Sequence, residues 1–196
     1  MNLKIIFNPF EKFNAKLLLF VGITFLVINI YASYLFGFLQ NSIFHYGFVG
    51  KNSTFPDSVK ISILSYLAGI VGLFVLGKIF NRKTRMIDIT NAVLISQIPL
   101  AFSILIGGIL FIKNILSPIE KLATENKIQE LQNIPKMDIF IICCYTFVVI
   151  WCLIYGIILI YNGFRTATNI KKWQQIAIFI IVTYLLMVTT QLIIKL

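Results

Sequence analysis

Apolar residues form five long runs that contain no Asp, Glu, Lys, Arg or His. The runs are Leu17–Leu39, Ile61–Gly77, Ala92–Ile112, Ile139–Tyr161 and Ile176–Ile194. An α-helix rises about 1.5 Å per residue, so about 20 residues cross a hydrocarbon core of about 30 Å. The long side chain of Lys78 can reach the headgroups, which lets the second run extend to Phe80. The pattern therefore predicts five transmembrane helices, at about 17–39, 61–80, 92–112, 139–161 and 176–194.

Composition narrows the fold class further. Of the 196 residues, 59% are hydrophobic and only 12% are charged, whereas about 25% are charged in a typical soluble domain. Backbone groups in lipid must be paired within the protein, and apolar residues surround each predicted helix on all sides. The alternating pattern of a membrane β-barrel does not occur. We therefore expect an all-α, polytopic membrane protein, with one five-helix domain at 17–196 after an N-terminal segment, 1–16.

Basic residues between the runs predict the orientation. With the N-terminus inside, ten of the 17 Lys and Arg residues lie on the inner side, and three of them crowd the short 81–91 connection. The external loop, 113–138, balances four cations with four acids. The positive-inside rule then places the N-terminus in the cytoplasm and the C-terminus outside. The net charge of +10 is spread over several loops, so we do not expect a nucleic-acid partner.

Three segments outside the runs carry local signals. In 1–16, Asn8, Pro9 and Glu11 predict a helix start, and an apolar stripe predicts either an interfacial amphipathic segment or an anchor packed under the bundle. The 40–60 region is rich in aromatic residues, which favours a position at the outer membrane interface. Ser117 and Pro118 predict that a polar helix begins in the external loop.

Candidate chemistry is sparse. An intramembrane proton relay or ion path normally needs an ionisable residue, and the five runs have none. The single histidine, His45, lies in the aromatic 40–60 region, and the sequence lacks zinc, phosphate-loop and dinucleotide motifs. Cys143, Cys144 and Cys152 have no His or carboxylate at the same depth to complete a metal site. We therefore expect these thiols to behave as small, buried hydrophobic residues. No catalytic residue, cofactor or metal site is predicted.

Neutral polar residues are the remaining candidates. Ser96, Gln97 and Pro99 fall near the start of the third run, and Gln191 lies near the end of the fifth. Pro99 should kink its helix and free a carbonyl that Ser or Gln can satisfy. These four residues predict either a hinged polar pocket or interhelical hydrogen bonds. Pairs of small residues four apart, such as Ser65 and Gly69, permit close helix packing within the bundle or between subunits.

Three stretches resemble the Yip-domain family of five-span membrane proteins, particularly its small bacterial members. They are 86–102, with a polar start and an internal proline, 151–169, with Tyr161-Asn-Gly-Phe-Arg165 at its exit, and Phe7-Asn-Pro-Phe10. The resemblance implies a cytoplasmic N-terminus and an external C-terminus, in agreement with the charges. Eukaryotic relatives are associated with Rab-type GTPases through a longer N-terminal region. The 16 residues before the first run do not match that region, so GTPase binding is not expected.

These observations predict a non-enzymatic, Yip-like integral protein of the bacterial inner membrane. We expect it to act in membrane organisation or trafficking-like processes through helix–helix and lipid contacts. Its partners would be the lipid bilayer and either further copies of itself or another membrane protein. The alternative is a small permease or channel subunit for a neutral solute, with Ser96, Gln97, Pro99 and Gln191 along its path.

Overall fold

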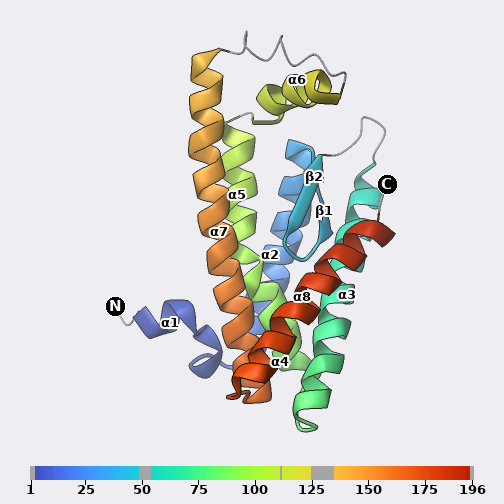
Figure 1. The fold of residues 1–196 in the computed structure, drawn as a ribbon, viewed down its shortest axis with the longest axis vertical. Coiled ribbons are helices and arrows are strands. Elements are labelled where there is room, and N and C mark those ends of the chain that lie inside the picture. The colour runs from blue at the N-terminus through green and yellow to red at the C-terminus, as the bar shows by residue number, and fades with distance from the viewer. Residues whose placement is uncertain (1–2, 49–53, 111, 125–134, 195–196) are drawn as a thin grey trace.

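The computed structural model describes residues 3–48, 54–110, 112–124 and 135–194 (Figure 1). The described elements are α1 (Leu3–Phe7), η1 (Pro9–Glu11), α2 (Ala15–Phe36), β1 (Phe38–Ser42), β2 (His45–Phe48), α3 (Phe55–Phe80), α4 (Met86–Ser96), α5 (Ile98–Ile109), α6 (Ile112–Thr124), α7 (Lys136–Thr168) and α8 (Trp173–Ile193). Five segments are long and apolar enough to cross a membrane: α2, α3, α4 continued by α5, α7 and α8. The predicted helical five-span fold is confirmed.

The third span lies at the centre of the bundle, between α2, α3 and α7, whereas α8 packs against α3 and β1. Ile89, Ala92 and Val93 of α4 are fully buried, and α4 packs against α2, α3 and α7. The outer helices instead expose large apolar side chains, such as Phe20 of α2 and Trp151 of α7. An outward apolar surface of this kind suits lipid, which needs no polar cover over the helices.

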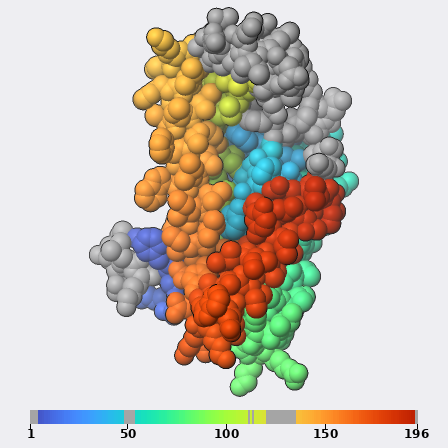
Figure 2. Space-filling model, viewed as in Figure 1, coloured from blue at the N-terminus to red at the C-terminus, as the bar shows by residue number. Residues whose placement is uncertain are grey.

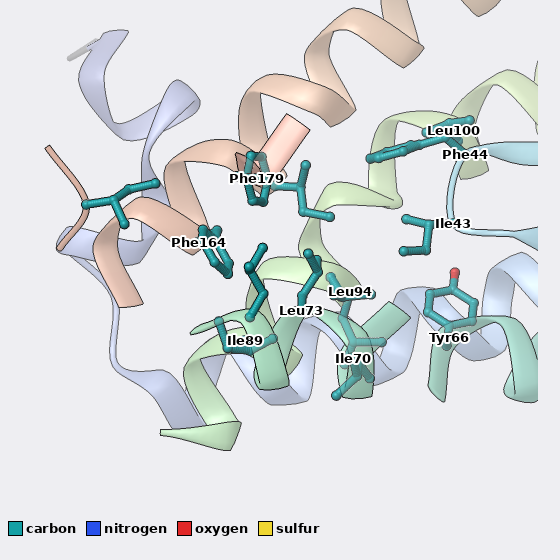
Figure 3. Close-up of a cluster of buried hydrophobic side chains, with 14 residues drawn as sticks. Ile43, Phe44, Tyr66, Ile70, Leu73, Ile89, Leu94, Leu100, Phe164 and Phe179 are labelled. Atoms are coloured by element: carbon teal, nitrogen blue, oxygen red, sulfur yellow. The ribbon is translucent and has the colours of Figure 1, made fainter. Parts of the chain in front are cut away.

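A large apolar cluster joins the helices to a β-hairpin (Figure 3). At one end of the cluster, the rings of Phe164 and Phe179 stack with centroids 4.6 Å apart, which joins α7 to α8. At the other end, Ile43 and Phe44 of the hairpin reach into the same cluster. Leu73 of α3 lies in the cluster with none of its surface exposed. The hairpin is therefore part of the hydrophobic core.

The hairpin begins at the end of the first predicted span and continues into the 40–60 segment that the sequence placed at the outer interface. The interface prediction is wrong for residues 40–48. Gly37 adopts a left-handed conformation with φ 72°, which ends α2 before Leu39 and turns the chain back. Strands β1 and β2 then pair antiparallel, with Gln40 opposite Tyr46, between α2, α3 and α8 (Figure 1). Non-helical backbone at this depth is stable because the strands pair with each other and protein covers them.

The third span is broken where the sequence predicted a kink. Helix α4 ends at Ser96, α5 begins at Ile98, and Gln97 between them is the cap of both helices. Pro99 lies in the first turn of α5, where its missing N–H costs no helical hydrogen bond. The kink expected at Pro99 is thus confirmed as a break at Gln97.

Two predicted helix starts differ from the structure. Asn8 makes no capping hydrogen bond, and Pro9 begins only a single 3-10 turn; the effective cap is Asn14, whose side chain accepts from the Lys16 N–H at 3.1 Å. In the loop that the sequence predicts to be external, α6 begins at Ile112 and carries Pro118 inside it. The carbonyl that Pro118 frees belongs to exposed Asn114, so water can satisfy it. Residues 125–134 of that loop lie outside the described residues.

The basic connections gather at one end of the bundle. Asn81 Nδ2 donates to the Thr168 carbonyl at 3.3 Å, which joins the turn after α3 to the end of α7. Exposed cations surround this junction: Lys78, Arg82, Lys83, Arg165, Lys171 and Lys172. The N-terminal segment packs near the same end, whereas α6 and the start of α7 lie at the opposite end (Figure 1). We call the end of the bundle that carries these six cations the basic end.

Candidate functional site

Asn29 is the centre of a buried polar cluster inside the bundle. It lies in the middle of α2 and is 1% exposed. Its Nδ2 is 3.0 Å from Gln40 Oε1, 2.8 Å from Tyr46 Oη and 3.0 Å from Tyr66 Oη. These three oxygens come from β1, β2 and α3, so one amide ties the first and second spans to both strands of the hairpin.

A chain of amides continues from Asn29 to the broken span. Gln40 Nε2 donates to Gln97 Oε1 at 3.1 Å, and Gln97 Nε2 donates to Ser96 Oγ at 3.2 Å. The Ser96 hydroxyl donates in turn to the Val93 carbonyl at 2.8 Å. Gln40, Ser96 and Gln97 are all at most 2% exposed. The helix break therefore places Gln97 where it can pair with the hairpin.

Serine hydroxyls attach the hairpin to α3 and α8. Ser65 Oγ of α3 donates to the Gln40 carbonyl at 3.1 Å. Ser42 Oγ donates to the Met187 carbonyl at 3.0 Å and lies 2.7 Å from Thr190 Oγ1, which reaches α8. A buried polar group without a partner costs about 1–3 kcal/mol. The hydrogen bonds above remove that cost for the polar groups that they pair. We call the side chains that form them the hairpin cluster: Asn29, Gln40, Ser42, Tyr46, Ser65, Tyr66, Ser96, Gln97 and Thr190.

Glycines let the helices approach the hairpin and the break closely. A Cβ at Gly69 of α3 would lie 2.6 Å from Ile43 Cγ1, and one at Gly156 of α7 would lie 2.8 Å from the Ser96 carbonyl oxygen. A Cβ at Gly107 would lie 2.6 Å from the Tyr145 hydroxyl. Gly69 belongs to the small-residue pair noted in the sequence, and Gly69 and Gly107 each face a side chain of their own chain.

The structure brings together three of the four predicted residues. Ser96 and Gln97 are members of the hairpin cluster, and buried Pro99 lies in the turn that follows. Gln191 is half-buried on α8; among the described residues its side chain joins no hydrogen bond, and the neighbouring Thr190 carries the contact to the hairpin instead.

Sequence reasoning missed Asn29, Gln40, Tyr46 and Tyr66, the four residues that form the centre of the cluster. A search for ionisable groups passes over neutral amides and phenols. The available signal was an Asn in the middle of a span, because such a residue needs a partner in lipid.

Among the described residues, no acidic, basic or histidine side chain forms a hydrogen bond of the hairpin cluster. His45 Nδ1 is 2.7 Å from Asn41 Oδ1 at the tip of the hairpin, and partial burial lowers the pKa of His45. Arg85 forms an ion pair with Asp88 at 2.9 Å at the basic end. Hydrogen bonding and the charge of Asp88 raise the pKa of Arg85. Across the described residues, no group of three or more His, Cys, Asp or Glu could hold a metal.

The fold and the hairpin cluster define a polytopic helical membrane protein with a re-entrant hairpin held by neutral polar side chains. The family model of the Yip1 domain matches residues 4–194, nearly the whole chain. The chain therefore belongs to the Yip1 domain family, which confirms the resemblance found in the sequence. Comparisons with curated proteins and with solved structures gave no match.

Proposed function

We propose that this Yip1 family protein is a non-enzymatic membrane protein that organises membranes through helix–helix and lipid contacts. The observation that supports the proposal is the pairing of the hairpin cluster: its polar side chains bond to one another across four of the five spans. The amides of Gln40 and Gln97 are paired with each other and line neither of the two cavities beside the N-terminal segment. Hydrogen bonds of this kind hold the spans and the hairpin together as a scaffold.

The basic end supports an orientation. Exposed lysines and arginines of two connections gather there with the N-terminal segment, and cytoplasmic loops carry an excess of such residues. We place this end, and with it the N-terminus, in the cytoplasm. The inner membrane of a bacterium is the location that the family resemblance favours.

The second candidate function is a small permease or channel subunit for a neutral solute. It draws support from the break at Gln97, because transporters build binding sites from discontinuous helices near the bilayer centre. Ser96, Gln97, Pro99 and Gln191 would be the residues along the path. Against it, the amides of Gln40 and Gln97 are already paired with each other at 3.1 Å.

Solute flux separates the two candidates. Liposomes with the purified protein, and with its Gln97→Leu and Gln191→Leu variants, would be tested for uptake of glycerol and urea by stopped-flow light scattering. We expect all three samples to match protein-free liposomes. Flux that the wild type supports and Gln97→Leu abolishes, with folding unchanged, would contradict the scaffold proposal. Crosslinking in cells would then identify the lipid and membrane-protein partners of the outward helix faces.

A further inference from the structure

Two cavities follow one another where the N-terminal segment packs against α7. The first has a volume of about 310 Å³ and is polar; its lining is Asn8, Glu11, Arg165, Thr166, Asn169 and Lys171. The second has a volume of about 380 Å³ and is apolar, with walls from residues 6–7, Pro99 and the 151–158 stretch of α7. Figure 2 shows the N-terminal segment, in blue, against the lower part of α7, in orange. We call them the polar cavity and the apolar groove.

Hydrogen bonds fix the N-terminal segment on α7 beside both cavities. Tyr155 Oη donates to the Ile6 carbonyl at 2.9 Å, and Asn162 Nδ2 donates to the Phe7 carbonyl at 2.8 Å. The Phe7 ring also meets the Tyr155 ring edge to face, with centroids 5.9 Å apart. Residues 6 and 7 thus contribute to the apolar groove, and the residues that follow them contribute to the polar cavity.

The polar cavity combines charges of both signs. Arg165 and Lys171 are cationic and suit a phosphate, whereas Glu11 is anionic. Asn8 adds a further acceptor, because its Oδ1 is buried and has no hydrogen-bond partner. A donor from a ligand could pair this acceptor. The lining therefore fits a ligand with one anionic group and one cationic group that donates hydrogen bonds.

The order of the two cavities along α7 matches the depth of a phospholipid. Arg165 lies one turn before the end of α7 at the basic end, and Trp173, 75% exposed at the start of α8, suits the headgroup level there. Ile158 of the apolar groove precedes Arg165 by seven residues, or about 10 Å of helix, toward the middle of the span. A phospholipid in the leaflet at the basic end would place its headgroup near Arg165 and its acyl chain near Ile158.

We propose that the polar cavity and the apolar groove together bind one phospholipid with an ethanolamine headgroup. Arg165 and Lys171 hold the phosphate, Glu11 and Asn8 Oδ1 accept from the ammonium, and one acyl chain lies in the groove against Ile158. A choline headgroup has no N–H to donate, and a glycerol headgroup leaves Glu11 facing a net negative lipid. The inference rests on the proposed function, in which the protein acts through lipid contacts, and it names the lipid class.

Native mass spectrometry of the full chain tests the selectivity directly. The protein in detergent is mixed with equal amounts of phosphatidylethanolamine, phosphatidylcholine and phosphatidylglycerol that carry the same acyl chains. We expect the first bound adduct to favour phosphatidylethanolamine about tenfold, as one additional hydrogen bond to a charged group would give. Equal binding of the three lipids, or a preference for phosphatidylglycerol, would overturn the proposal. Competition by water-soluble phosphoethanolamine at the same concentration would overturn the role of the groove.

Two variants test which residue binds the ammonium and which binds the phosphate of the headgroup. Glu11→Gln should remove the preference over phosphatidylcholine, and Arg165→Gln should weaken the binding of all three lipids by a similar factor. Lys78→Gln is the matched control, because Lys78 lies at the same end and does not line the polar cavity. If Glu11→Gln retains the preference, the proposal fails. Absence of solute flux together with unselective lipid binding would leave the scaffold role standing and remove only this site.

Discussion

Replacing Asn29 by Leu should destabilise the protein by about 2–3 kcal/mol. The two side chains are similar in size, so the change removes hydrogen bonds and leaves little cavity. Asn29 Nδ2 has three oxygen partners within 3.0 Å, and an interhelical hydrogen bond in a membrane protein contributes about 0.6 kcal/mol on average. Nδ2 carries two N–H groups and so makes two full hydrogen bonds at a time, worth about 1 kcal/mol together, and oxygens left buried without a donor raise the total cost to about 2–3 kcal/mol.

The assay is equilibrium unfolding of the purified protein in mixed micelles, with an SDS titration followed by circular dichroism. Ser33→Ala is the control, since Ser33 lies one turn along α2 and donates to Asn29 Oδ1 only over 3.5 Å; its effect should stay below about 0.5 kcal/mol. Gln97→Leu acts on the same chain of amides through Gln40. The variant that combines Asn29→Leu with Gln97→Leu should therefore lose less free energy of unfolding than the sum of the two single losses, by at least about 0.5 kcal/mol. An Asn29→Leu protein as stable as the Ser33→Ala protein would refute the reasoning.

Three further changes test the fold around the hairpin cluster and its orientation. Gly156→Ala should lower the free energy of unfolding by about 1–3 kcal/mol, because its Cβ would lie 2.8 Å from the Ser96 carbonyl oxygen. Gly47→Ala is the control: its Cβ would have only Asn41 Nδ2 nearby, at 3.9 Å, so it should be neutral in the same unfolding assay. Ser42→Ala removes both bonds to α8 and should lower the free energy of unfolding by about 1 kcal/mol; an unchanged midpoint would count against that attachment. In a background without the native cysteines, Lys83→Cys should resist an impermeant maleimide in intact cells and Lys136→Cys should react, and the reverse pattern would overturn the orientation.

The spans could be predicted from the sequence because lipid imposes a simple rule. A helix needs about 20 apolar residues to cross the bilayer, and a charged residue within it is costly. The five runs satisfy that rule, and Pro99 indicated the one interruption because proline cannot donate to the helix. Ser96 and Gln97 could also be singled out from the sequence, because neutral polar groups in lipid must find partners.

The hairpin could not be predicted in this way, because its surroundings decide its place. Gln40, Asn41 and Ser42 lie between aromatic residues, which is also the composition of an interfacial loop. What places them inside is a match over long sequence distances: Ile43 fits beside Gly69, and Gln40 meets Asn29 and Gln97. Sequence periodicity carries no information on such partners.

A disulfide between positions 43 and 69 tests most directly whether the hairpin lies inside the bundle. In an Ile43→Cys and Gly69→Cys protein without its native cysteines, the clashing Ile43 side chain is gone and the two Cβ atoms should fall near the roughly 4 Å that a disulfide requires. Oxidation in membranes should then give an intrachain crosslink. Val71→Cys, on the exposed face of α3, should give none with Ile43→Cys. Failure of the first pair to crosslink, together with labelling of Ile43→Cys by an impermeant maleimide, would contradict a hairpin buried among the helices.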